Sequence, residues 1–255
     1  METIFPLFST TDLALAAMVA LAAGFVKGVV GFAMPLVFIS GLTLFMPPEL
    51  ALAGLILPTL VTNVQQSLRQ GVAAAVESSR QFRVFLICGL VTLLIAAQFV
   101  RMIPTVTFMA TIGVMVSFFA MLQLAGWRPN LARKSFRIEA AVGGFAGVLG
   151  GLSGIWGPPT VAYLTALHTP KHEQMRVQGV IYGLGAVALF GAHLASGVLR
   201  SDTFGFSVAM IFPAIIGMWL GGQVMDRIDQ VVFRRLTLLV LLVAGLNLLR
   251  RAWLA

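Results

Sequence analysis

Glycines and a proline with one spacing, GxxxGxxGxxxP, occur twice in this chain, each time inside an apolar stretch. The first copy comprises Gly24, Gly28, Gly31 and Pro35, and the second, 123 residues later, comprises Gly147, Gly151, Gly154 and Pro158. Both residue types interrupt helices, and a helix that restarts after a break presents unpaired N–H groups and the positive end of its dipole. Such a helix start binds anions. Duplicated breaks in apolar segments also mark the binding sites of repeat-built transporters.

A small anion is therefore expected between the two breaks, at residues 28–36 and 151–160. Glycines allow the backbone to approach a ligand closely. Small residues also let helices pack closely, and we favour that role for Gly24 and Gly147. The residues expected to bind the anion are Lys27, Gly28, Gly31, Phe32, Pro35, Asn63, Gln66, Gly151, Ser153, Gly154, Trp156, Pro158, Gln178 and Tyr182.

Three of these residues carry polar groups that could bind an oxyanion directly in the first half of the chain. Lys27 lies deep in an apolar stretch, where a charge is costly and indicates function; the alternative is a side chain that snorkels to the interface. Asn63 and Gln66 are three residues apart and share a helix face. Their amides can donate hydrogen bonds to an oxyanion, or they can bond neighbouring helices instead. Both alternatives stay open for each residue.

The composition is that of a membrane protein. Hydrophobic residues make up 59% of the 255 positions and charged residues 10%, whereas soluble domains carry about 25% charge. The net charge of +8 comes from basic residues in short loops, which the positive-inside rule explains without a nucleic acid partner. The single Cys88 excludes an internal disulfide.

The positions of the acidic and catalytic residue types exclude several functions. All nine Asp and Glu residues fall at segment ends or in loops, which argues against a cation pump and against a proton antiporter driven by carboxylates. No HExxH motif is present, and His168 and His172 flank Pro170, so that metal-ligand geometry is not expected. We therefore expect no enzyme activity, no metal and no cofactor.

The apolar stretches form two sets of five in matching order. They run at 12–30, 35–46, 50–68, 84–100 and 104–126, then at 138–156, 158–168, 177–199, 205–224 and 231–250. We expect an all-α integral membrane protein with about eight to ten membrane segments in two five-segment repeats. The predicted parts are a first repeat at 1–127, a cytoplasmic loop at 128–137 and a second repeat at 138–255.

The distribution of Lys and Arg favours an inverted arrangement of the repeats. With five crossings per repeat, the loops at 69–83, 127–137, 168–176 and 225–235 share one side. They then hold twelve basic residues against four on the other side, whereas parallel repeats divide them ten against six. Segments 35–46 and 158–168 cover only about 18 Å as helices, so we interpret them as half-helices that open at a proline. Whether they are re-entrant or fully spanning stays open.

The stretches that carry these motifs resemble a known family. GFVKGVVGFAMPLV (24–37), LPTLVTNVQQSLRQG (57–71) and GVLGGLSGIWGPPTVAYLTAL (147–167) are similar to segments of the TauE/SafE sulfite exporter family of bacterial membrane permeases. The resemblance implies transport, usually export, of small sulfur-containing anions such as sulfite or organosulfonates. Two departures lie at the predicted site: Ala33 stands where many relatives have glycine, and Trp156-Gly157 precedes Pro158.

The expected function is thus a multi-pass transporter of a small anion in the bacterial inner membrane, with the bilayer and the anion as its partners. An anion channel would use the same site with a continuous water path, and a permease for another small oxyanion or a carboxylate is the further alternative. Neither the identity of the anion nor the direction of transport follows from the residues. The oligomeric state, a homodimer included, is also left open.

Overall fold

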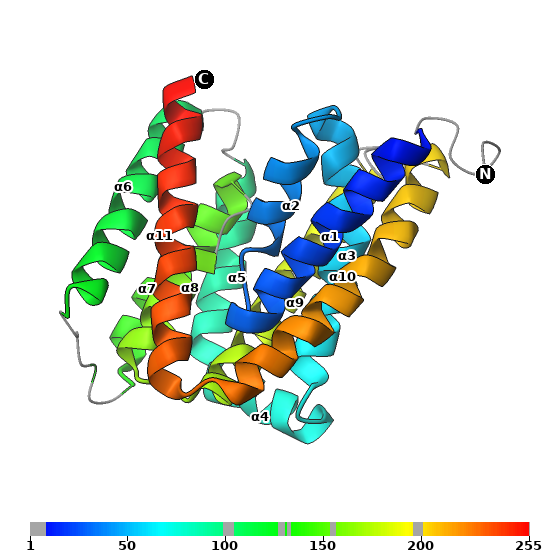
Figure 1. Ribbon diagram of the computed structural model, residues 1–255. Helices are drawn as coiled ribbons and strands as arrows, with labels where there is room; N and C mark the ends of the chain where they lie inside the picture. The colour runs from blue at the N-terminus through cyan, green and yellow to red at the C-terminus, as the bar shows by residue number, and fades with distance from the viewer. Residues whose placement is uncertain are drawn as a thin grey trace. The chain divides into compact units, whose positions relative to one another are not determined.

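The computed structural model describes residues 9–98, 105–126, 131, 134–153, 157–195 and 201–254. These residues form helices and no strand, which confirms the predicted all-α fold. The helices of the described residues, labelled in Figure 1, are α1 (Thr10–Val30), α2 (Met34–Leu42), α3 (Pro48–Leu68), α4 (Val72–Gln81), α5 (Arg83–Gln98), α6 (Thr105–Leu124), α7 (Phe136–Ser153), α8 (Gly157–Ala166), α9 (Lys171–Ala195), α10 (Ser201–Arg227) and α11 (Gln230–Leu254).

Several of these helices suit a lipid bilayer. Within the described residues, α1, the Thr203–Arg227 part of α10, and α11 are each long and apolar enough to cross a membrane. The pair α4 and α5, bent by 74° at their junction, makes a fourth candidate. Helices satisfy their backbone hydrogen bonds internally, as the hydrocarbon interior requires. The chain is a membrane protein, and the number of eight to ten segments stays a prediction.

The helices extend into regions that we expected to be loops. Val72–Gln81, inside the expected loop 69–83, forms α4. Helix α9 already begins at Lys171, within the expected loop 168–176, and α10 continues to Arg227, within the expected loop 225–235. Hydropathy marks the residues that can lie in hydrocarbon, but helical hydrogen bonding continues into polar residues. In α4, five apolar residues at 72–76 are followed by five polar ones, so the apolar run is too short to indicate a membrane segment.

Three pairs of helices in the two predicted repeats begin at matching positions. Helices α2 and α8 begin 123 residues apart, as do α3 and α9, and α6 and α11 begin 125 residues apart. The short helices after the breaks have nine and ten residues, and each has a proline at its second position, Pro35 in α2 and Pro158 in α8. The starts of these three helix pairs thus follow the spacing of the sequence motifs, while the division into two repeats and their inverted arrangement stay predictions.

The chain divides into two compact units, and neither coincides with a predicted repeat. The first unit combines Met1–Arg69 with Tyr182–Ile228. In it α1 packs along α10, α10 packs against α3, and α2 contacts both α1 and α3 (Figure 1). Small residues of α1, among them Ala16 and Ala20, form a core with Phe38 of α2 and Phe206 of α10, and all four are fully buried.

The second unit combines Gln70–Ile181 with Asp229–Ala255. Its main contacts join α5 to α7 and α6 to α11, and α8 packs against α7, α6 and α11 (Figure 1). The buried carboxylate of Glu139 in α7 accepts a hydrogen bond from the backbone N–H of Phe85, 3.1 Å away in the first turn of α5. A side chain of one helix therefore caps the start of its neighbour.

Candidate functional site

The first predicted break lies between α1 and α2 and consists of Gly31, Phe32 and Ala33. Gly31 has a φ of 87° and ends α1, with its N–H donating to the carbonyl oxygen of Lys27 at 2.7 Å. Ala33 has a φ of 69°, in the left-handed region that glycine adopts at no steric cost. Phe32 is buried, whereas Pro35 in the first turn of α2 is exposed. The Gly/Pro motif therefore marks a real interruption of the helix.

Lys27 lies one turn before this break, and its amino group is inside the protein. The side chain is only 2% exposed, and it donates a hydrogen bond to the side-chain oxygen of Asn63 in α3. A lysine that snorkels to the interface would expose its ammonium, so that alternative does not describe this side chain. Asn63, 1% exposed, in turn donates to the carbonyl oxygen of Tyr182 in α9 at 3.2 Å.

A second amide of α3 contacts the break directly. The side-chain nitrogen of Gln66, which is also buried, donates to the carbonyl oxygen of Gly31 at 3.1 Å. One turn earlier in α3, the Thr62 hydroxyl bonds to the carbonyl oxygen of Pro58 at 2.6 Å and lies 3.5 Å from the sulfur of Met34. The polar face of α3 therefore lies against Lys27 and the α1–α2 break. Both amides form the interhelical hydrogen bonds that were the alternative to a binding role.

The amino group of Lys27 has no acidic partner in the part of the chain that the structure describes, since no carboxylate there lies within ion-pair distance of its nitrogen. An ion pair at the end of α3 joins Arg69 to Asp226 of α10 at 2.5 Å. Arg69 also lies beside Gly222 of α10, and Gly222 lies against Gly28 of α1. The region around the first break thus has a buried basic group beside oriented amides, with no carboxylate partner among the described residues.

The second predicted break falls outside the described residues, since Gly154 and Trp156 are not among them and the Ser153 side chain is not described. Gly151 lies in the last turn of α7, and Pro158 is buried in α8. Gln178 and Tyr182 are four residues apart in α9 and almost fully buried. The approach of the two breaks to one shared anion stays a prediction.

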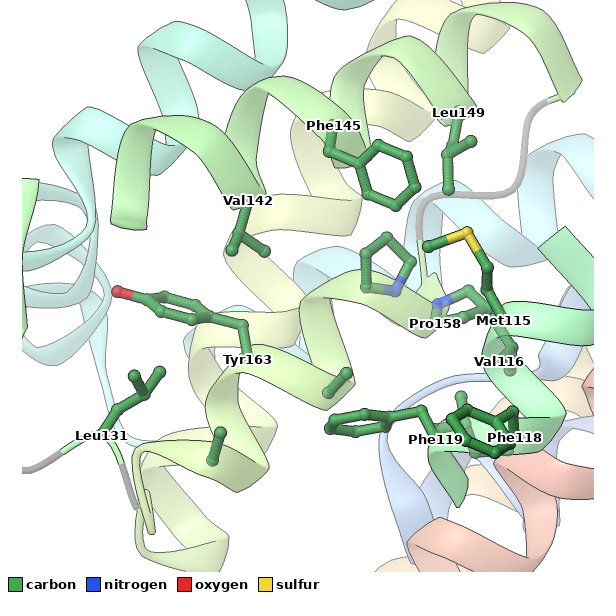
Figure 2. Close-up of a pocket in the computed structure, with 14 residues that line it drawn as sticks. Met115, Val116, Phe118, Phe119, Leu131, Val142, Phe145, Leu149, Pro158 and Tyr163 are labelled. Carbon is green, nitrogen blue, oxygen red and sulfur yellow. The ribbon is translucent and has the colours of Figure 1, made fainter. Parts of the chain in front are cut away.

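The second unit contains a cavity of about 470 Å³ that the sequence did not indicate. It lies between α6, α7, α8 and α11, and apolar side chains such as Phe118, Phe119, Phe145 and Leu149 line it together with Pro158 (Figure 2). Its lining offers almost no polar surface to an anion. Most of its residues come from ordinary apolar stretches far apart in the sequence. Pro158 belongs to the second motif, but the motif by itself does not indicate a cavity.

Comparison with known proteins agrees with the resemblance stated from the motifs. A family model described as sulfite exporter TauE/SafE matches residues 16–248. No curated protein and no solved structure is similar enough to this chain to count as a match. The matched region contains both predicted breaks and Lys27, Asn63 and Gln66. The chain belongs to the TauE/SafE sulfite exporter family and is a membrane transporter.

Proposed function

We propose that this protein exports a small sulfur-containing anion, such as sulfite or an organosulfonate, across the bacterial inner membrane. The observation that carries the proposal is the buried amino group of Lys27, which donates to a neutral amide beside the α1–α2 break and has no carboxylate partner among the described residues. A buried ammonium without a counter-charge is destabilising by several kcal/mol. A bound anion would supply the missing negative charge.

The surrounding groups suit an oxyanion better than a cation. Asn63 and Gln66 present amide N–H groups on the same face of α3, at present bonded to backbone carbonyls of Tyr182 and Gly31. Amide donors and an ammonium together match the several acceptor oxygens of a sulfite or sulfonate group. The first turn of α2 would add backbone N–H groups at the break. The second break, at residues 151–160, would add the equivalent helix start from the other repeat.

The test is uptake and counterflow of radiolabelled sulfite and organosulfonates in proteoliposomes. Saturable flux with trans-stimulation supports a carrier, whereas linear flux without it supports an anion channel. Lys27→Met removes the charge and should raise the KM for the anion about tenfold or more, because hydrogen bonds to charged groups contribute about 1.5–3 kcal/mol.

The matched control for that variant is Lys134→Met, since Lys134 lies outside the candidate site in the stretch before α7, over the Phe82 ring. This variant should leave the KM unchanged. Equal KM values for wild type, Lys27→Met and Lys134→Met would overturn the assignment of the site. Absence of saturable flux for every sulfur oxyanion would overturn the proposed substrate class.

A further inference from the structure

We infer that Lys27 binds a proton together with the anion and releases it when the anion leaves, so that one proton crosses the membrane with each transported anion. The inference rests on the proposed function, because it assigns the coupling of the same site. In the empty site the neutral amine donates to Asn63. Uptake of one proton turns the amine into an ammonium, and its charge then balances one negative charge of the bound anion.

The contacts of Lys27 are the reason for this assignment. Its nitrogen bonds to an amide oxygen, which accepts a hydrogen bond from a neutral amine as well as from an ammonium. The Asn63 amide is held in this orientation by its own donation to the Tyr182 carbonyl. The side chain is only 2% exposed, and a permanent charge at so buried a position is costly without a counter-charge. The geometry thus accommodates both protonation states without rearrangement of Asn63.

Charged groups on the helices around Lys27 are occupied or distant. On α1 itself Asp12 is 15 residues away, about 22 Å along the helix, and caps the helix start with Ser9. Helix α2 has no charged residue, and Glu49 lies at the far end of α3 from Asn63. On α10, Asp226 follows Gly222 by one turn and is paired with Arg69, and Arg227 is a further cation.

Helix α9 carries Lys171, His172, Glu173 and Arg176 in its first two turns, at least six residues before Tyr182, and further titratable groups lie in α9 and α10. Tyr182 of α9 is buried beside Asn63, and its carbonyl oxygen accepts the Asn63 amide. The side chains of His193 and Asp202 are not among those that the structure describes. Among the described groups, therefore, none is placed to hold Lys27 as a permanent ammonium in the empty site.

Proton and anion binding at one site must favour each other equally, because such coupling is reciprocal. The affinity for the anion should therefore fall as the pH rises, by up to tenfold per pH unit. An inward anion gradient should also drive protons inward. Arginine keeps its proton at every accessible pH, so Lys27→Arg should bind the anion with no pH dependence and move no protons.

The experiment uses the full-length protein in proteoliposomes that contain a pH-sensitive dye, with methanesulfonate as the probe. Methanesulfonate is the anion of a strong acid and carries no proton of its own, unlike sulfite. We expect close to one proton per anion for the wild-type protein and none for Lys27→Arg. If only sulfite is transported, the proton count is taken as the difference between wild type and Lys27→Arg.

The outcomes separate the inference from the proposed function. Saturable anion flux without proton movement, or with an affinity that is independent of pH, overturns the inference and leaves the proposed function intact. Absence of saturable flux at any pH overturns the proposed function and the inference with it. If Lys27→Arg does not reach the membrane, the proton count of the wild-type protein with methanesulfonate decides alone.

Discussion

Gly24 of α1 lies directly against the carbonyl group of Ala214 in α10, so close that a Cβ atom at position 24 would overlap the oxygen. Gly147 of α7 meets the carbonyl group of Gly89 in α5 in the same way. The two contacts are equivalent, since Gly147 follows Gly24 by 123 residues and Ala214 follows Gly89 by 125. The first apolar segment of each predicted repeat therefore packs against the fourth apolar segment of the other repeat.

Gly24→Ala should destabilise the protein because two backbones would have to separate to admit the methyl group. Overpacking of a well-packed contact costs about 1–3 kcal/mol, which should appear as a lower midpoint of thermal unfolding in detergent. Gly144→Ala in α7 is the control, since a Cβ there would meet only the Thr92 methyl group at 3.6 Å. This control should be neutral or slightly stabilising. Equal midpoints for both variants would contradict the close helix contact.

Ala33→Gly should stabilise the protein, because Ala33 holds a φ of 69° at the break. An L-residue in the left-handed region costs about 1–2 kcal/mol. The greater freedom of glycine in the unfolded chain offsets about 0.4–1 kcal/mol of that gain. The comparison is Ala73→Gly in α4, exposed and helical, which should lose about 0.5–1 kcal/mol. A loss of stability in Ala33→Gly would contradict the backbone conformation of the break.

Pro35→Leu should impair anion flux more than folding. Pro35 sits in the first turn of α2, where its missing N–H costs nothing, and its removal lets the helix start shift. We expect flux to fall several-fold while the unfolding midpoint changes little. Pro48→Leu is the matched variant, because Pro48 occupies the first turn of α3 away from the break. Normal flux in Pro35→Leu, or equal losses in both variants, would count against a binding role for the α2 start.

Asp226→Asn should change stability by less than about 1 kcal/mol. The ion pair with Arg69 is more than a third exposed on both sides, at 36% and 41%, and exposed pairs contribute little because water screens them. The small loss should shrink further at high salt. Thermal unfolding at low and high ionic strength measures both effects. A loss that is large and independent of salt would show that this pair acts as a buried one.

Glu139→Ala should destabilise the start of α5, because the buried N–H of Phe85 would lose its acceptor. An unpaired buried donor costs about 1–3 kcal/mol. Glu139→Gln retains a carbonyl oxygen in the same place and should recover most of the loss. The midpoints of thermal unfolding of the two variants are compared. A higher midpoint for Glu139→Gln supports the cap, and equal midpoints would show that Glu139 only fills space.

Local patterns in the sequence predicted the features that depend on local chemistry. Gly31 and Pro35 predicted the break after α1, because glycine and proline act on the backbone where they stand. The apolar stretches predicted an all-helical membrane protein, and the isolated charge of Lys27 predicted a polar region inside it. The sequence also placed Asn63 and Gln66 on one helix face, which the structure confirms.

Only the tertiary structure showed which residues from distant segments contact each other. Lys27 bonds to Asn63, 36 residues away, and Gly24 contacts Ala214. In neither pair does the sequence around one residue indicate its partner. The sequence left open whether Lys27 snorkels or is buried. It also did not predict α4, because the hydropathy of its apolar first half and its polar second half averages to near zero. Helix–helix pairing depends on which surfaces become neighbours when the whole chain folds. That information is distributed over segments far apart in the sequence, so no single motif contains it.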